Sequence, residues 1–167
     1  SQYTVSASVS DKAGNPASTT HGLAVDLTVP VLTINTVSGD DIINAAEHGQ
    51  ALVISGSSTG GEAGDVITVT LNSKTYTTTL DASGNWSVGV PAADVSNWPA
   101  GTLNITVSGA NSAGTQTSIT HPLTVDLTTV AVSINSITSD DVINAAEKGA
   151  ALTLSGSTSG VEAGQTV

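Results

Sequence analysis

The sequence repeats itself with a period of 100 residues. When residues 1–67 are aligned with residues 101–167, no gap is needed and 30 of the 67 positions are identical. The longest identical stretches are Ile43–Glu47, which recurs as Ile143–Glu147, and Val25–Thr28, which recurs as Val125–Thr128. Such a period indicates a tandem array of similar units, and about 100 residues is the length of one β-sandwich domain.

Within one period, runs of alternating apolar and hydroxyl residues predict half-buried strands separated by turn-forming residues. We expect seven strands, at about residues 31–37, 51–57, 66–72, 74–80, 86–90, 102–109 and 116–126. Segment 91–100 lacks this alternation and is expected to be an irregular crossing with one helical turn. Seven short strands per period predict an all-β fold of tandem immunoglobulin-like β-sandwich repeats.

Differences between the two copies show which strand face points inward. Leu52 and Ile54 stay apolar in the second copy, whereas Val53 between them becomes Thr153. Even-numbered positions of this strand should therefore face the core, because strand side chains alternate between two faces. The same alternation predicts these further core members: Leu32, Ile34, Ile67, Val69, Leu71, Tyr76, Leu80, Trp86, Val88, Leu103, Ile105 and Val107.

The recurring Val-Asp-Leu-Thr tetrapeptide sets the expected domain limits, because it ends the last strand of one unit and leads into the next. We predict the last two strands of one repeat at residues 1–28, a complete repeat at residues 29–128, and the N-terminal part of the next at residues 129–167. The two end parts are expected to be too small to bury a core alone.

Composition excludes several classes of function. The net charge of -11 comes from 14 acidic residues against three lysines and no arginine. Such a surface repels phosphate backbones and anionic lipid, so we expect no nucleic-acid partner and no membrane docking, and no apolar run is long enough for membrane insertion. Cysteine is absent, and no Gly-x-Ser-x-Gly elbow or Cys-His pair occurs. We therefore predict that the chain is not an enzyme.

The acidic residues follow the period closely. Ten of the fourteen form five pairs one period apart, Asp26/Asp126, Asp40/Asp140, Asp41/Asp141, Glu47/Glu147 and Glu62/Glu162, whereas no lysine is matched. We expect them to gather around one junction. Asp26 would lie in the linker, Asp40 and Asp41 in a loop of the following unit, and Asp11 or Asn111 in the last turn of the preceding one.

Calcium takes six to eight oxygen ligands from Asp, Glu, Asn and backbone carbonyls, and tolerates irregular geometry. The sequence therefore predicts Ca²⁺ at the junctions. The candidate ligands are Asp11, Asp26, Asp40, Asp41, Asn44, Glu47, Glu62, Asn111, Asp126, Asp140, Asp141, Asn144, Glu147 and Glu162. The alternative is that these are solvated loop acids, with Asp40 and Asn44 capping a short turn around residues 44–47.

Four segments, Val25–Thr28, Asp40–Glu47, Ser55–Gly64 and Asp81–Val88, together resemble the bacterial Ig-like repeats of giant type I-secreted adhesins and biofilm-associated proteins of Gram-negative bacteria. The resemblance implies an extracellular stalk on the bacterial surface, with junction calcium stiffening the rod. It implies neighbouring repeats of the same chain as partners, and a host-cell or biofilm-matrix surface reached through the parent protein. By position it places Asp11, Asp26, Asp40 and Asp41 among the junction ligands.

A second hypothesis is an Ig-like repeat that itself binds a host glycan or receptor. Residues 68–100 have no second copy in the chain and could contain a binding loop. Trp98, which we expect to be exposed, is the aromatic residue to test there, although packing is its expected role.

Overall fold

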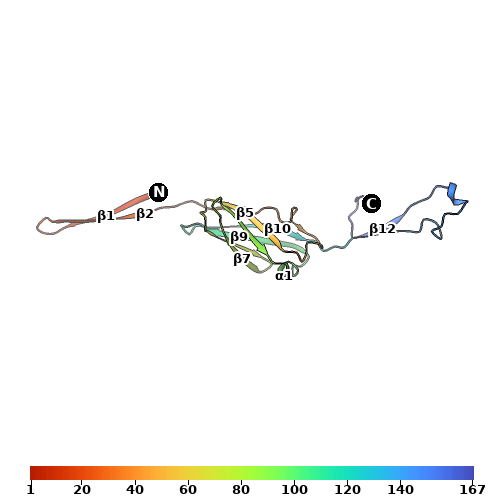
Figure 1. Ribbon diagram of the computed structural model, residues 1–167. Helices are drawn as coiled ribbons and strands as arrows, with labels where there is room; N and C mark the ends of the chain where they lie inside the picture. Colours follow the sequence, from red (N-terminus) through yellow and green to blue (C-terminus); the bar gives the residue numbers. More distant parts are fainter.

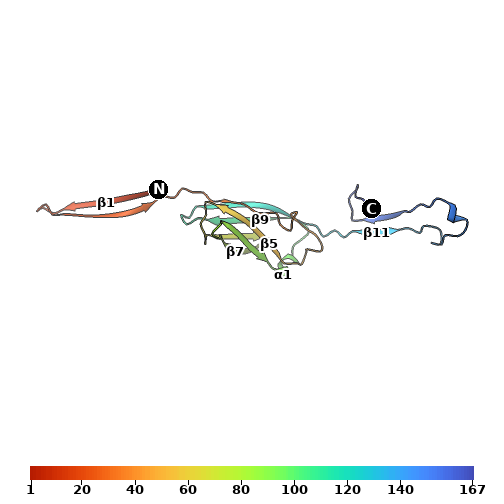
Figure 2. The ribbon, with the colours of Figure 1, turned by 45° about the horizontal axis from the view of Figure 1, so that its top comes forward.

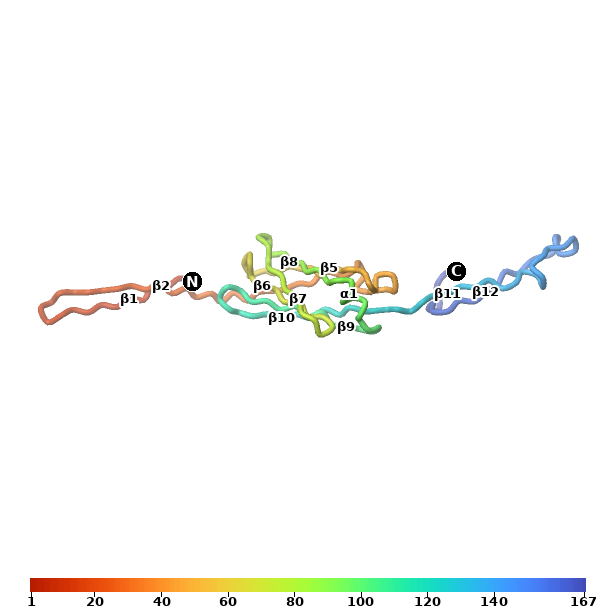
Figure 3. The backbone as a smooth tube through the Cα atoms, turned by 60° about the horizontal axis from the view of Figure 1, so that its bottom comes forward, coloured from red at the N-terminus to blue at the C-terminus, as the bar shows by residue number.

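The computed structural model describes all 167 residues, Ser1 to Val167, and shows an elongated molecule built almost entirely of β-strands (Figure 1). A central β-sandwich lies between a two-stranded hairpin on its N-terminal side and a two-stranded pair on its C-terminal side. The rotated ribbon (Figure 2) and the backbone tube (Figure 3) show the three parts following one another along one direction. No helix is long and apolar enough to span a bilayer.

The central sandwich has two sheets. The strands are β3 (Val31–Leu32), β4 (Ile42–Ile43), β5 (Leu52–Thr59), β6 (Val66–Leu71), β7 (Lys74–Thr79), β8 (Asn85–Val90), β9 (Gly101–Ala110) and β10 (Gln116–Val125). One sheet has the order β4-β10-β9-β6-β7 and the other the order β3-β5-β8. Neighbouring strands are antiparallel except β4, which runs parallel to β10. The predicted all-β, immunoglobulin-like sandwich is thus confirmed.

Local sequence explains the connections on one side of the sandwich. Asn72 and Ser73 have positive φ angles of 47° and 62° and form the two-residue turn between β6 and β7. Positive φ at both central positions gives the type I′ turn, whose twist matches that of the paired strands. The crossing from β8 to β9 contains the expected helical turn, α1 (Ala92–Val95), which follows Pro91 and buries Val95.

Sixteen buried apolar residues form a single core between the two sheets. The predicted inward positions all belong to this core or pack against it, with Ile34, Leu52, Tyr76, Val88 and Leu103 only partly buried. Trp98 is 3% exposed, so the expectation that it lies on the surface is wrong and its role is packing. The alternation did not predict these further core members: Val37, Ile43, Val90, Val95, Leu123 and Val125.

The strand expected at residues 31–37 is shorter than predicted. Regular pairing covers only Val31–Leu32, because the hydroxyl of Thr33, and not its carbonyl, accepts the next ladder hydrogen bond, from Ser57 N–H at 3.0 Å. The chain then crosses to the other sheet, where the two-residue strand β4 pairs with β10. This parallel strand was not predicted, since two isoleucines in a polar loop carry no periodic signal.

The end parts contain β1 (Gln2–Ser10) and β2 (Pro16–Ala24) on the N-terminal side, and β11 (Ala131–Ile134), the 3₁₀ turn η1 (Glu147–Gly149) and β12 (Gly156–Ser159) on the C-terminal side. Their pairing follows the period. Ser8 lies opposite Ser18 as Ser108 lies opposite Ser118, and Ala131 lies opposite Ser159 as Val31 lies opposite Thr59. The strands therefore keep one register from unit to unit.

The apolar residues of these end strands have no facing sheet. Val5 is 56% exposed and Leu23 is 50% exposed, whereas Ile105 and Leu123, one period later, are both fully buried. As expected, the end parts bury no core of their own. The stability of the molecule therefore rests on the central sandwich, where sixteen apolar residues are buried in one core.

The contact between Gly56 and Trp86 gives a test of this core. A Cβ atom on Gly56 would lie 1.9 Å from Thr33 O and 2.6 Å from Trp86 Cζ2, so Gly56→Ala should lower the free energy of unfolding by about 3 kcal/mol through overpacking. Gly89→Ala is the matched control, because a Cβ there meets no atom within 4 Å. Urea denaturation should show a large loss for the first variant and a change within about 1 kcal/mol for the second. Equal effects would contradict the packing described.

Candidate functional site

The loop between β3 and β5 is held by reciprocal hydrogen bonds at the C-terminal end of the sandwich. Asn44 Oδ1 accepts from the N–H groups of Ala46 and Glu47 at 2.9 and 3.1 Å, and Glu47 Oε2 accepts from Asn44 N–H at 3.1 Å. This arrangement is a capping box. The Ser38 hydroxyl donates to the other carboxylate oxygen, and this bond, followed by that from Asn44, lowers the pKa of Glu47. Both oxygens of Glu47 thus stabilise the loop.

Asp41 ties the same loop to β10. Its Oδ1 accepts from Val37 N–H at 2.8 Å and lies 2.8 Å from His121 Nε2, while its carbonyl accepts from Thr124 N–H at 2.9 Å. Partial burial raises the pKa of Asp41, but the Val37 hydrogen bond and the contact with His121 outweigh it, and the pKa lies below its ordinary value. Asp41 is therefore an ionised anchor between the loop and the last strand.

Hydrogen bonds also fix the start of the linker that follows β10. Asp126 N–H donates to Ile43 O at 2.9 Å, and Asp126 Oδ1 accepts from Thr128 N–H at 2.9 Å. Hydrogen bonding from the Thr128 side chain and then its backbone lowers the pKa of Asp126. Asp26 and Thr28 form the same turn one period earlier, also at 2.9 Å, with the same effect on the pKa of Asp26. Each linker is therefore shaped locally by its own aspartate.

At the N-terminal end of the sandwich, two loops meet the incoming linker. Asn111, in the turn between β9 and β10, donates from Nδ2 to Thr28 O at 2.9 Å. Gly60, at the end of β5, lies against the linker so closely that a Cβ atom would be 2.8 Å from Thr28 Cγ2. Glu62 belongs to the same loop, where its N–H donates to Asp65 Oδ2 at 2.8 Å. This end thus brings together Glu62, Asn111 and the linker of Asp26.

The structure corrects the expected grouping of the acids. Asp40 and Asp41 lie beside Thr124 and Asp126, at the C-terminal end of the sandwich, and not beside Asp26. The two ends are separated by the ten residues of β10, or about 33 Å of strand. The prediction that Asp26, Asp40 and Asp41 share one junction is therefore wrong. It assumed that the loop of Asp40 and Asp41, which comes early in the repeat sequence, also lies at the N-terminal end of the sandwich.

Asp11 is also placed differently from the expectation. It lies in the turn at the tip of the β1–β2 hairpin, whereas Asp26 follows its open end, so the two lie at opposite ends of the hairpin (Figure 1). Asp11 accepts hydrogen bonds from the N–H groups of Ala13 and Asn15, both at 2.9 Å, and from Asn15 Nδ2 at 2.8 Å. The side-chain bond from Asn15, followed by the backbone bonds, lowers the pKa of Asp11.

The third copy repeats the loop structure without a core. Asp141 accepts from Ile137 N–H at 2.9 Å, and Asn144 and Glu147 form a second capping box. Asp140 accepts from Val142 N–H at 3.1 Å, as Asp40 accepts from Ile42 N–H at 3.0 Å. Because these hydrogen bonds recur 100 residues apart, they explain why Asn and acids are kept at these positions. Glu162 lies in the loop equivalent to that of Glu62, after β12.

The residues at the two ends are oxygen donors suited to a hard cation, although no group of three or more acidic or histidine side chains converges in a geometry that could hold a metal ion. At the C-terminal end the donors are Asp40, Asp41 and Asp126, with the backbone carbonyls around them. At the N-terminal end they are Asp26, Glu62 and Asn111. Any complete coordination shell would therefore draw on backbone oxygens or on a neighbouring repeat.

Sequence reasoning missed three contributors to these ends: Gly60, His121 as the partner of Asp41, and Leu127. Leu127 packs against the core of the central repeat, whereas Leu27 is 85% exposed. All three recur one period apart, at Gly60 and Gly160, His21 and His121, and Leu27 and Leu127. That recurrence was the available signal, but only the fold shows what each residue contacts.

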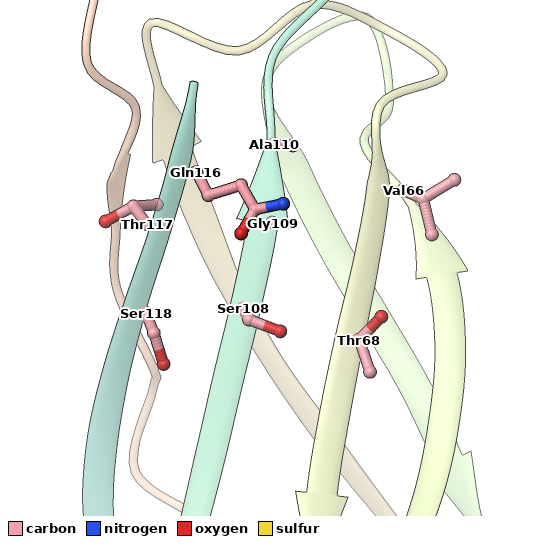
Figure 4. A pocket seen from close by; sticks show the side chains of 8 residues that line it. All are labelled: Val66, Thr68, Ser108, Gly109, Ala110, Gln116, Thr117 and Ser118. Atoms are coloured by element: carbon pink, nitrogen blue, oxygen red, sulfur yellow. The ribbon is translucent and has the colours of Figure 1, made fainter. Parts of the chain in front are cut away.

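A surface hollow lies elsewhere, on the outer face of the five-stranded sheet (Figure 4). Figure 4 shows Thr68, Ser108 and Ser118 side by side on β6, β9 and β10, in agreement with the strand register. The hollow holds about 450 Å³ and is lined by Val66, Thr68, Ser108, Gly109, Ala110, Gln116, Thr117 and Ser118. None of these side chains is ionisable.

No protein-family model and no curated protein matches the sequence, whereas several solved structures do. A calcium-stabilised adhesin that helps an Antarctic bacterium to bind ice is 36% identical over 93% of this chain and 39% of its own, with a TM-score of 0.52. A tetra-tandem repeat from the extending region of a large adhesion protein is 26% identical over 94% of this chain and 38% of its own, with a TM-score of 0.55.

A bacterial immunoglobulin-like domain from the M. primoryensis ice-binding adhesin is 37% identical over 99% of its length and 59% of this chain. This chain belongs to the bacterial Ig-like repeats of large adhesins. The TM-score of 0.46 for that domain adds no structural support, and the assignment rests on the sequence identities together with the shared fold of the longer adhesin chains. This Ig-like repeat chain spans about two-fifths of those longer chains.

The lowered carboxyl pKa values of the repeat predict its response to acid. A carboxyl whose pKa is lower in the folded than in the unfolded state contributes stability above the unfolded value, near 4, and loses it as pH falls through the folded value. Asp26, Asp41, Glu47 and Asp126 all have lowered pKa values. The free energy of unfolding, measured by urea denaturation, should be nearly constant between about pH 5 and 7 and fall from about pH 4 towards pH 2. Unchanged stability at pH 2.5 would contradict the hydrogen bonding described.

Proposed function

We propose that this chain is a spacer segment in the stalk of a large bacterial surface adhesin, stiffened by calcium bound where successive repeats meet. In this proposal residues 29–128 form one complete repeat, and residues 1–28 and 129–167 belong to its two neighbours. The matched tetra-tandem repeat comes from the extending region of a large adhesion protein, which supports a spacing role. The extracellular, cell-surface location follows from the same family membership.

The observation that carries the calcium proposal is the position of the paired acids in the fold. Asp40, Asp41 and Asp126 lie at the C-terminal end of the sandwich, and Asp26 and Glu62 at the N-terminal end. When repeats follow one another, the acids at the N-terminal end of one repeat meet the acids at the C-terminal end of the repeat before it. Each junction would therefore combine acids from the end of one repeat, from the linker, and from the start of the next.

The chemistry of these donors suits calcium better than magnesium. Asp26, Asp40 and Asp126 each accept a backbone N–H of their own turn through Oδ1, and this bond uses only one of the several acceptor sites of a carboxylate. Carboxylate oxygens from separate loops and linkers suit the irregular six- to eight-fold shell of calcium, whereas magnesium requires near-ideal octahedral geometry. A bound cation would also offset repulsion in a chain of net charge -11.

A relative supports the same ion, because the adhesin that is 36% identical is itself calcium-stabilised. Asn44 and Glu47 fit a structural role better than a ligand role, since the capping box uses the oxygens of both side chains. Type I secretion and a place in biofilms follow from the sequence resemblance and remain predictions. The adhesive surface of the parent protein would lie outside these repeats.

A calcium titration tests the proposal. If the dissociation constant is about 10⁻⁴ M, as in other extracellular modules, 10 mM calcium should stabilise the fold by about 2.7 kcal/mol and raise the melting temperature by about 10 °C or more. Calorimetry should detect the binding heat, and chelator should reverse the shift. Magnesium at the same concentration should have a much smaller effect.

Matched variants separate junction binding from general charge effects. Asp126→Asn should remove most of the calcium-induced shift, because it removes the linker carboxylate. Asp81→Asn is the control, since Asp81 shapes a turn with Oδ1 in the same way, accepting from Ser83 and Asn85 N–H at 2.8 Å, but lies between β7 and β8 and not in a linker. Absence of both binding heat and thermal shift in the unmodified chain would rule the proposal out. If both variants lose the calcium-induced shift equally, the ion does not bind at the junction.

A further inference from the structure

The joint at the start of the central repeat contains one hydrogen bond that needs no ion. Asn111 Nδ2 donates to Thr28 O across 2.9 Å, linking the turn between β9 and β10 to the linker 83 residues earlier. Asn111 is only 6% exposed, and its Oδ1 is also used, accepting from Thr115 N–H at 2.9 Å. We propose that the residue at this turn position determines whether a repeat is tied directly to the linker that enters it.

The linker is shaped in advance to present this carbonyl. Asp26 Oδ1 accepts from Thr28 N–H and forms a turn in the linker, so the orientation of Thr28 O does not depend on Asn111 alone. Gly60 allows the linker to approach β5, because a side chain there would be strained by the φ of 78° and would bring its Cβ within 2.8 Å of Thr28 Cγ2. Gly160 lies in the same way against Thr129 O. The close approach is therefore a feature of both joints.

The tie acts on the angle between repeats because the other side of the linker is also fixed. One period later, Asp126 N–H is bonded to Ile43 O and Leu127 packs against the core of the repeat behind. The next residue, Thr128, is the equivalent of Thr28, which the repeat ahead holds through its turn asparagine. No unrestrained residue then separates the two attachments. Losing the asparagine bond frees the linker on the side of the following repeat.

The preceding copy of the turn carries Asp11 in place of asparagine. Asp11 keeps the turn itself, since it accepts from Asn15 N–H at 2.9 Å just as Asn111 accepts from Thr115 N–H. A carboxylate, however, has no N–H to donate, and its charge repels a carbonyl oxygen. A repeat with asparagine here is tied to its linker without any cation, and a repeat with aspartate is not. The array thus contains joints of two kinds that differ by one residue.

The experiment uses the whole chain in chelator, so that calcium makes no contribution and the outcome is independent of the calcium proposal. In the unmodified chain, ¹⁵N relaxation should give backbone order parameters for Thr28 and Val29 near the value of about 0.85 typical of rigid backbone. Asn111→Asp should lower them towards about 0.6, while the order parameters of β5 and β9 stay unchanged. Asp11→Asn, the reverse exchange at the distant hairpin tip, should leave the linker values as they are.

A second variant guards against misfolding of the first. Asn111→Ser retains an acceptor for Thr115 N–H but is too short to reach Thr28 O, so it should also release the linker. If either variant, with the strands of the sandwich intact, keeps order parameters at Thr28 and Val29 equal to those of the unmodified chain, the asparagine does not tie the joint and the inference is wrong. Loss of order in the linker of Asp11→Asn would overturn it equally.

Discussion

Burial of one face of each strand between two sheets is the constraint on which the rest of this structure depends. Only the central unit satisfies it, and there Ile105 and Leu123 are fully buried, whereas Val5 and Leu23 in the preceding hairpin are at least half exposed. Because the buried face is aliphatic and the outer face is rich in threonine and serine, no strand can shift by one residue without exposing its apolar side. The fixed register sends the turns and loops to the two ends of the sandwich, where repeats meet.

The polar residues at those ends stabilise the loops and linkers of the joint through hydrogen bonds that need no ion. Asp41, Asn44 and Glu47 stabilise the loop that lies beside the end of β10, and Asp126 shapes the linker that follows β10. Asn44 caps the turn at residues 44–47, as the alternative of local capping predicted, whereas Asp40 accepts from Ile42 N–H in a turn of its own. Such turn formation is compatible with calcium at Asp26, Asp40 or Asp126, because the backbone bond to Oδ1 leaves further acceptor sites on each carboxylate. Turn formation and ion binding are compatible in one carboxylate.

A stalk of such repeats gains its mechanical properties from contacts at every joint. The hydrophobic contact of Leu127 with the repeat behind and the hydrogen bond from Asn111 to Thr28 with the repeat ahead are both independent of cations. Calcium, as proposed, would add a contribution that depends on the medium. A chain that mixes asparagine and aspartate at the turn position can then combine permanently tied joints with joints that respond to the ion. The stiffness of each joint would then depend on which residue occupies this turn position.

The sequence by itself determined the period, the all-β class, six of the strands to within two or three residues, and the inward positions from Leu32 to Val107. These follow from local alternation and from comparison of two copies, and both are visible without coordinates. The strand β4, the buried position of Trp98, and the membership of Ile43 in the core were decided by tertiary structure. None of them has a local period, because each depends on which distant segment lies opposite.

The same division applies to the candidate site. The sequence identified the acids that recur, but it placed Asp11, Asp26 and Asp40 around one junction, and the fold assigns them to different ends of their repeats. Spacing along a chain cannot say at which end of a sandwich a loop lies, since that depends on the direction in which its flanking strands run. Only the pairing of β4 with β10 brings Asp40 and Asp41 next to Asp126. Only the turn between β9 and β10 brings Asn111 back to Thr28.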